Sequence, residues 1–168
     1  MSCSKSQPKI ELEKGVVDIV FETLTWSIYF FCVVYLFMIY SDLPDIIPLH
    51  MNAKGEVDGY GSKAFIWVFL VIGLLTAVSM QLIQRIPHSF NYMVKITEKN
   101  AKSQYQISVQ MIRFINLFIA LLWICILLVM TGMSESDEYT PPTWTIWMLI
   151  GTMTMGIFYY VRLSLKHK

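Results

Sequence analysis

The sequence is short of charge. Asp, Glu, Lys and Arg make up 15% of its 168 residues, whereas about a quarter is usual in a soluble domain. Hydrophobic residues make up 55% of the chain, and the mean hydropathy is +0.53. This balance excludes an ordinary water-soluble domain and indicates that lipid is the main solvent of the chain.

Charge is missing altogether from four stretches: residues 23–41, 64–84, 114–134 and 139–161. Each is close to the roughly 20 residues that a helix needs to cross about 30 Å of hydrocarbon. Proline is also missing from the apolar cores of these stretches, so nothing interrupts a helix there. We therefore predict membrane-spanning helices, which satisfy their own backbone hydrogen bonds in lipid.

The predicted fold is all-α, an integral membrane four-helix bundle with a short extracytoplasmic hairpin-like loop between its first two helices. A single domain over residues 1–168 would contain spans at about 17–40, 64–84, 112–131 and 143–162, an outer loop at 41–63, and a cytoplasmic loop and stalk at 85–111. Thr97 precedes a run of good helix formers, which predicts an N-cap there. The third helix should then run for about 34 residues, or roughly 50 Å.

Cysteine is scarce, and the motifs of common enzymes are missing. Cys3, Cys32 and Cys125 are too few and too scattered for a disulfide framework. The sequence has no Ser nucleophile elbow, no paired His on a helix, no Cys near a His and no Gly-rich phosphate loop. We therefore expect a protein that is not an enzyme, with no catalytic residues, no metal and no cofactor. The net charge of +1 gives no support for nucleic-acid binding.

Basic residues are distributed unevenly over the predicted connections. Of the 13 Lys and Arg residues, only Lys54 and Lys63 lie in the outer connections; the others lie in the N-terminal tail, the middle connection and the C-terminus. The positive-inside rule therefore predicts that both termini are cytoplasmic. The first apolar run is longer than a signal-peptide core and no small-residue cleavage site follows it, so we expect it to remain as a span.

The segment "LPDIIPLHMNAKGEVDGYGSK", residues 43–63, is rich in polar and turn-forming residues. Two prolines exclude a continuous helix, and two strand-like pieces flank a turn, so we predict a small hairpin. Gly55 would supply a positive φ in the turn. Gly59 and Gly61 would let the chain bend sharply into Ser62, which would cap the second span.

The same segment has a functional interpretation. His50, Asn52, Glu56 and Asp58 could form a polar cluster that binds an ion, a peptide or a lipid headgroup. If the hairpin pairs as predicted, His50 and Asp58 face one another, but a single His without a nearby Cys is a weak metal signature. A hydrogen-bonded structural turn is the alternative interpretation, and the sequence leaves both open.

Polar residues also fall inside or at the edges of the predicted spans. Glu22 and Arg113 lie at the inner edges of the first and third spans, and we predict that they approach each other, because isolated charges at such depth are costly. The alternative is that each extends to the interface. Asn116 is expected to hydrogen-bond between helices. Glu22 also suggests a second function, since small four-span multidrug transporters of similar size use a membrane glutamate.

The outer loop resembles the signature of a bacterial membrane family, domain of unknown function 1648. The matching residues are Pro44, Ile47, Pro48, His50, Asn52, Gly55, Asp58, Gly61, Ser62 and Lys63. Met51 replaces the usual Phe, and the segment "FNYMVKITEKNAKSQY" is also similar, which extends the resemblance over roughly residues 16–131. The resemblance implies a multi-pass protein of the bacterial cytoplasmic (inner) membrane.

Larger relatives implied by this resemblance are immunity proteins against the sporulation-delay toxin, which also signal by holding a repressor at the membrane. This chain lacks their additional helices. We therefore expect a non-enzymatic immunity, sensing or accessory protein that acts through its outer loop, with a small proton-coupled transporter as the alternative. Its expected partners are the lipid bilayer, a protein or peptide at the outer loop, and a second copy of the chain, but no nucleic acid.

Overall fold

The computed structural model describes residues 7–52, 56–135 and 142–168. In chain order the elements are α1 (Val16–Ile39), β1 (Ile46–Met51), β2 (Val57–Ser62), α2 (Phe65–Ile83), the 3-10 helix η1 (Pro87–Ser89), α3 (Ala101–Glu135) and α4 (Thr143–Lys166). The described chain is therefore mostly helical, as predicted. It is not all-α, because the loop between the first two helices forms a two-stranded sheet.

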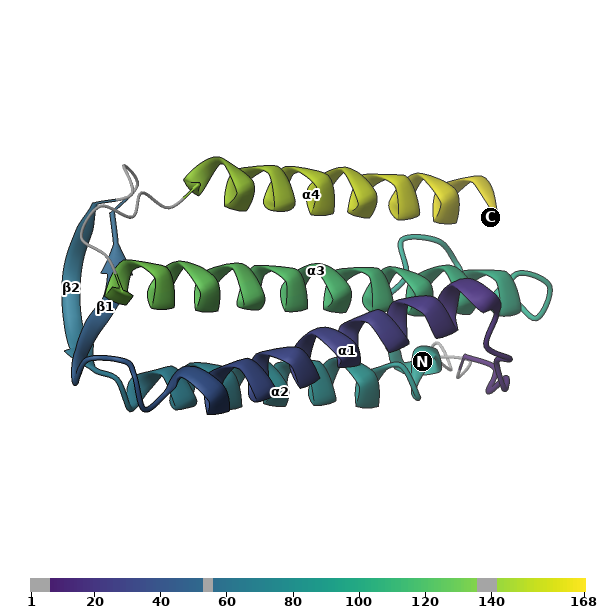
Figure 1. Ribbon diagram of the computed structural model, residues 1–168. Coiled ribbons are helices and arrows are strands. Elements are labelled where there is room, and N and C mark those ends of the chain that lie inside the picture. Colours follow the sequence, from purple (N-terminus) through teal and green to yellow (C-terminus); the bar gives the residue numbers. More distant parts are fainter. Residues whose placement is uncertain (1–6, 53–55, 136–141) are drawn as a thin grey trace, which may run out of the picture.

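The four long helices lie alongside one another, and the β1–β2 hairpin lies across one end of them (Figure 1). We call this end the hairpin end. The start of α1 and the end of α4 lie at the opposite end, which we call the terminal end (Figure 1). Helix α3 runs through the middle, with α4 on one side and α1 and α2 on the other, so it organises the whole arrangement.

All four helices are long and apolar enough to cross a membrane. Many of their large apolar side chains are exposed, among them Phe30, Phe37, Val71, Leu75 and Phe158. Exposed apolar surface of this extent is rare on water-soluble monomers. Length, composition and exposure together indicate a multi-pass membrane protein.

Helix α3 has 35 residues, which corresponds to about 50 Å. The turn before it is closed by a reciprocal pair: Thr97 N donates to Asn100 Oδ1 at 2.8 Å, and Asn100 N donates to Thr97 Oγ1 at 3.4 Å. Thr97 therefore caps this preceding turn, as its side chain predicts, but regular helix begins only at Ala101.

The sides of α1, α2 and α3 that face one another change from apolar to polar along the protein. At the hairpin end the buried cluster consists of Cys32, Leu36, Leu43, Ile47, Ile66, Leu70, Leu127 and Met130. In the middle, Tyr29 packs with the small residues Ala77 and Ala120. At the terminal end the buried polar residues are Asp18, Thr25, Gln84, Arg113 and Asn116. The interior therefore has an apolar half and a polar half.

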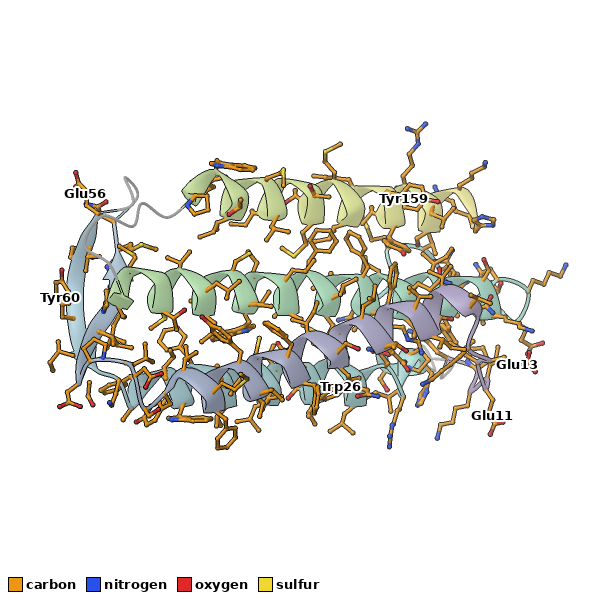
Figure 2. The ribbon with its side chains drawn as sticks, viewed as in Figure 1. Glu11, Glu13, Trp26, Glu56, Tyr60 and Tyr159 are labelled. Atoms are coloured by element: carbon orange, nitrogen blue, oxygen red, sulfur yellow. The ribbon has the colours of Figure 1, made fainter. Side chains whose placement is uncertain are left out.

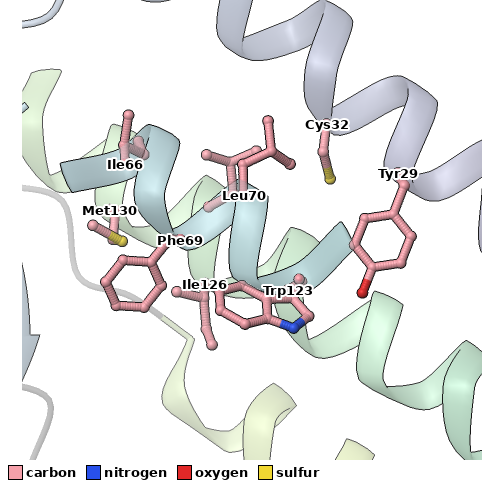
Figure 3. Close-up of a pocket in the computed structure, with 10 residues that line it drawn as sticks. Tyr29, Cys32, Ile66, Phe69, Leu70, Trp123, Ile126 and Met130 are labelled. Atoms are coloured by element: carbon pink, nitrogen blue, oxygen red, sulfur yellow. The ribbon is translucent and has the colours of Figure 1, made fainter. Parts of the chain in front are cut away.

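A small cavity of about 20 Å³ lies in the apolar half, between α1, α2 and α3. Figure 3 shows Tyr29 and Cys32 of α1 on one side of it and Trp123 of α3 on another. The hydroxyl of Tyr29 is buried without a hydrogen-bond partner among the described residues. The rest of the lining is apolar, so the cavity offers a water molecule too few polar partners.

Helix α4 makes the arrangement more open than the predicted bundle, because it packs mainly against α3. Gly156 allows the close approach: a Cβ there would overlap the ring of Phe114. At the terminal end, Gln104 Nε2 donates to the carbonyl oxygens of Ser164 and His167, both at 2.8 Å. These contacts hold α4 along one side of α3 and leave most of its surface exposed.

Candidate functional site

The hairpin has an anchored inner face and an exposed outer face. Strands β1 and β2 pair antiparallel, and Ile47 of β1 is fully buried in the apolar cluster at the end of the helices. On the outer face, Ile46 and Tyr60 are 60% and 67% exposed. Tyr60 projects away from the helices at the hairpin end (Figure 2). Side chains alternate along a strand, so Ile46, Pro48 and Tyr60 share the outer face, where Pro48 is buried and the other two are exposed.

The polar residues of the motif pair with one another across the hairpin. His50 Nδ1 and Asp58 Oδ1 are hydrogen-bonded, and both side chains are exposed. Asn52 Nδ2 donates to Glu56 Oε2 at 2.8 Å, and the backbone N of Glu56 donates to Asn52 Oδ1 at 3.1 Å. The predicted facing of His50 and Asp58 is confirmed. Both pairs stabilise the hairpin, and the first also presents a polar group to solvent.

The glycines of the motif differ from their predicted roles. Gly55, the predicted turn residue, lies outside the described residues. Gly59 and Gly61 lie within β2, and neither has a left-handed φ, so the prediction that they bend the chain into Ser62 is wrong. They are needed for close approach instead: a Cβ at Gly61 would overlap Leu49 Cδ1, and one at Gly59 would lie 3.0 Å from the Cβ of His50.

The predicted cap at Ser62 is also wrong, because Ser62 ends β2 and the N-cap of α2 is Ala64. The Ser62 hydroxyl accepts a hydrogen bond from Ala64 N at 3.3 Å, which shapes the turn between strand and helix. Pro48 is buried and lies opposite Tyr60 in the strand register. Ser62 and Pro48 therefore shape and pack the hairpin.

Lys63 ties the base of the hairpin to the end of α1. Its Nζ donates to Leu43 O at 2.8 Å, lies 3.3 Å from Asp45 Oδ1, and lies 5.3 Å from the centre of the Tyr40 ring. The ammonium thus has a carbonyl, a carboxylate and an aromatic face around it. Its role in the motif is to fix the hairpin on the helices.

At the terminal end, the predicted approach of Glu22 and Arg113 is confirmed. Arg113 Nε lies 2.9 Å from Glu22 Oε1, and its Nη1 lies 2.7 Å from Asp18 Oδ1. Lys14 Nζ lies 2.5 Å from the other oxygen of Glu22. Asp18 also accepts a hydrogen bond from Gly15 N at 2.8 Å, where α1 begins. Two acids and two bases therefore neutralise one another at the end of α1.

The sequence analysis missed Asp18 and Lys14 as members of this network. Asp18 lies one helical turn before Glu22, and Thr25 and Tyr29 continue the same buried side of α1. This spacing of three and four residues was available in the sequence and marks one face of a helix. Helical spacing therefore identifies Asp18. The contact between Lys14 and Glu22 depends on the path of the chain before α1. The spacing of residues along a helix does not predict that path.

A polar cleft continues from this network toward the middle of the protein. It has a volume of about 400 Å³, and residues of the segment before α1 and of all three facing helices line it, including Glu22, Gln81, Gln84 and Arg113. The same four residues line a smaller continuation that reaches Asn116. Asn116 Nδ2 donates to Ala77 O of α2 at 3.4 Å, as expected for a residue that joins helices.

The segment before α1, which supplies part of the cleft wall, is held by hydrogen bonds at the terminal end. Gln7 Nε2 donates to Phe90 O at 3.1 Å, and Tyr105 donates to Pro8 O at 2.9 Å. Tyr92 donates to Pro87 O at 2.9 Å. Burial raises the pKa of Tyr92 to about 12, so its hydroxyl remains a donor at neutral pH. The segment before α1 is therefore held against the connection between α2 and α3.

The structure thus presents two candidate sites, the outer face of the hairpin and the polar cleft. Within residues 7–52, 56–135 and 142–168, no three His, Cys, Asp or Glu side chains are grouped so that they could hold a metal ion. The hairpin face combines hydrogen-bonding and charged groups with exposed apolar side chains. The polar cleft combines such groups with apolar lining residues. Such groups suit recognition of a partner or ligand.

One comparison with known proteins finds a family to which part of the chain is similar. A family model described as "Domain of unknown function (DUF1648)" matches residues 28–76. This segment contains most of α1, the whole hairpin and the first part of α2, and it is shorter than the range 16–131 that the sequence resemblance suggests. No curated protein and no solved structure matches the chain. Residues 28–76 are therefore similar to the DUF1648 family.

Proposed function

We propose that this chain is a non-enzymatic protein of the bacterial inner membrane that recognises a protein or peptide through the outer face of its hairpin. Immunity, sensing and accessory roles all use such recognition. The observation that supports the proposal is the division of the hairpin into a buried face and an exposed one. Ile47 is fully buried, whereas Ile46 and Tyr60 on the other face are 60% and 67% exposed.

The exposed face combines features of a recognition surface. Tyr60 and Ile46 supply apolar area, and the His50–Asp58 pair adds exposed polar groups to the same hairpin. Tyr is enriched among residues that dominate binding energies, because it combines an apolar ring with a hydroxyl. The clamp at Lys63 keeps the surface rigid, so a partner would lose little entropy in ordering it.

The proposed orientation places the hairpin outside the cell. Of the 13 Lys and Arg residues, 11 lie in the tail, the middle connection and the C-terminus, and these parts of the described chain belong to the terminal end (Figure 1). The positive-inside rule then supports cytoplasmic termini. An external partner would meet the hairpin first.

A small proton-coupled transporter is the second candidate, favoured by the position of Glu22 in a polar cleft. Both carboxylate oxygens of Glu22 are already paired, one with Arg113 and one with Lys14. A carboxylate so held is poorly placed to exchange protons with a substrate. Proton-coupled flux in liposomes that disappears in Glu22→Gln would favour transport over recognition.

The recognition proposal is tested by photocrosslinking in cells of the source organism. A photoreactive amino acid at position 60 should yield a discrete protein adduct. The same group at position 158, an exposed apolar position on α4, should yield none. His50→Ala and Asp58→Ala should reduce the adduct at position 60 while membrane abundance stays normal.

Two results would contradict the proposal. Position 60 could give no more protein adduct than position 158, which would leave the hairpin without a partner. Alternatively, His50→Ala and Asp58→Ala could lower the membrane abundance of the protein, which would make the pair a structural element only.

A further inference from the structure

The two edges of the hairpin sheet differ in how accessible they are. The sheet has two strands, so among the described residues neither strand has a second strand on its other side. Strand β1 lies against α3 as well as against β2, whereas β2 packs mainly against β1. Figure 1 also shows β2 farther from the helices than β1. The side of β2 that faces away from β1, which we call the free edge of β2, is therefore the more accessible edge.

The strand register shows which backbone groups of β2 point to its free edge. Lys63 N donates to Asp45 O at 2.9 Å. The next pair of the ladder is Ile46 with Ser62. In an antiparallel ladder, hydrogen-bonded pairs alternate with pairs that are not hydrogen-bonded. Ser62, and Tyr60 two residues before it, therefore belong to pairs of the second kind, and their N–H and C=O groups point away from β1.

Proline blocks the edge of β1 but not the free edge of β2. Pro48 lies opposite Tyr60, so its nitrogen also faces away from the partner strand, and proline has no N–H to donate there. Proline and lysine are among the residues that protect sheet edges from pairing with another chain. Strand β2 has the sequence VDGYGS and contains neither. The free edge of β2 can therefore accept another strand.

The segment that contains the hairpin is acidic. Residues 41–63 contain four acids and two bases. Asp58 and Tyr60 lie on the same exposed side of β2, and among the described residues the Asp58 carboxylate is bonded through Oδ1 alone, to His50. Charge complementarity favours a basic partner, whose cation can also lie over the Tyr60 ring. A second copy of this chain would bring the same excess of acids, which opposes pairing of two hairpins.

We propose that an extended, basic segment of a partner protein adds a third strand to the free edge of β2. This inference rests on the proposed recognition at the hairpin and specifies how the partner binds. The backbone of the segment hydrogen-bonds with Tyr60 and Ser62, as when a peptide extends the sheet of another protein. Its basic side chains lie on the exposed side, beside Asp58 and Tyr60. Its apolar side chains alternate with them and lie on the side that faces the helices.

Photocrosslinking in cells separates strand addition from recognition in general. Ser62→Pro removes an outward N–H and leaves the ladder to β1 intact, whereas Ser62→Ala, the matched control, removes the hydroxyl alone. With a photoreactive amino acid at position 60, Ser62→Pro should yield roughly tenfold less partner adduct, because a hydrogen bond is lost. Ser62→Ala should yield as much adduct as the chain with Ser62.

The outcomes of this experiment distinguish the two proposals. An undiminished adduct in Ser62→Pro would overturn strand addition and leave the proposed recognition standing. Absence of any protein adduct with Ser62 in place would overturn both. An adduct that joins two copies of this chain would show that the occupant of the edge is a second copy rather than a basic partner.

Synthetic peptides test the charge and the backbone of the partner on the purified full chain, without any variant that could fail to fold. The probe is a short peptide of alternating Lys and Val, and its binding in detergent is measured by fluorescence anisotropy. Replacement of every Lys by Glu should weaken binding roughly tenfold. N-methylation of one alternate set of backbone amides should prevent binding, whereas methylation of the other set should not, because only one set faces β2. Equal binding of the Lys and Glu peptides, or equal effects of the two methylations, would overturn the proposal.

Discussion

At the scale of single residues, Arg113 holds the polar half of the interior together. It is 9% exposed and contacts two carboxylates from successive turns of α1. A buried cation with two acceptors in good geometry offsets much of its own desolvation cost. Removal of Arg113 would leave the carboxylates of Asp18 and Glu22 close together with only Lys14 to compensate them.

We therefore expect Arg113→Met to lower the free energy of unfolding by roughly 3–5 kcal/mol, the usual cost of breaking a buried ion pair. Denaturant unfolding in detergent would measure it. Addition of Asp18→Asn and Glu22→Gln to the same variant should restore most of the loss, since no buried charge then remains unpaired. If the triple variant were as unstable as Arg113→Met, packing of the Arg side chain rather than charge would be its main contribution.

The pairing of Glu22 with Arg113 could be predicted from the sequence, because two charges at the same depth of adjacent spans have few other partners in lipid. The roles of Gly59 and Gly61 could not. A glycine preference arises equally from a positive φ or from a close neighbour. The bulge that brings Leu49 against Gly61 depends on strand register, which spacing alone does not give.

At the scale of elements, α4 depends on very few contacts. Gly156 lies against the Phe114 ring, which in turn packs against Phe118 and Tyr160 at centroid distances of 4.6 and 5.7 Å. The ring therefore has little room to move. Gly151, more than one turn earlier on the same helix, has no atom within 4 Å of the place where its Cβ would lie.

This difference gives a matched pair of variants. Gly156→Ala should destabilise the protein by roughly 1–3 kcal/mol, the usual cost of overpacking, because the new methyl group forces α4 away from α3. Gly151→Ala should leave stability unchanged or raise it by up to about 1 kcal/mol through helix propensity. Thermal unfolding in detergent would compare them. Equal effects of the two substitutions would show that α4 is not held by this contact.

The four helices and the hairpin could be predicted from the sequence because hydrocarbon imposes strong limits on length and polarity. The packing of α4 could not be predicted in the same way. In lipid, an apolar helix surface needs no protein partner, so the pattern of apolar residues does not show which side of α4 faces α3. Gly156 was the main local signal, and its neighbour Phe114 lies on another element.

At the scale of the whole molecule, the two candidate sites lie at opposite ends of the helices (Figure 1). The apolar cluster between them, with Leu36, Ile66 and Leu127 among its members, separates the polar cleft from the hairpin. A continuous polar path through the interior is therefore closed in this structure. A solute therefore has no continuous polar route through the interior of this structure.

Because the two candidate sites lie at opposite ends, the orientation of the protein in the membrane decides which site faces the outside. Cysteine labelling measures this orientation. In a background without native cysteines, we expect Tyr60→Cys to react with a membrane-impermeant maleimide in intact cells. His167→Cys, at the terminal end, should react only after the membrane is opened. The physical reason is the excess of Lys and Arg at the terminal end, because the positive-inside rule predicts that such an end stays in the cytoplasm.

Val71→Cys supplies the internal control, because position 71 lies inside α2 and its side chain is exposed. In a membrane this thiol is surrounded by lipid, so it should remain unlabelled in both conditions. Labelling of His167→Cys but not Tyr60→Cys in intact cells would reverse the orientation and place the hairpin in the cytoplasm. An external toxin or signal could then not meet the hairpin, and the proposed recognition would have to involve a cytoplasmic partner.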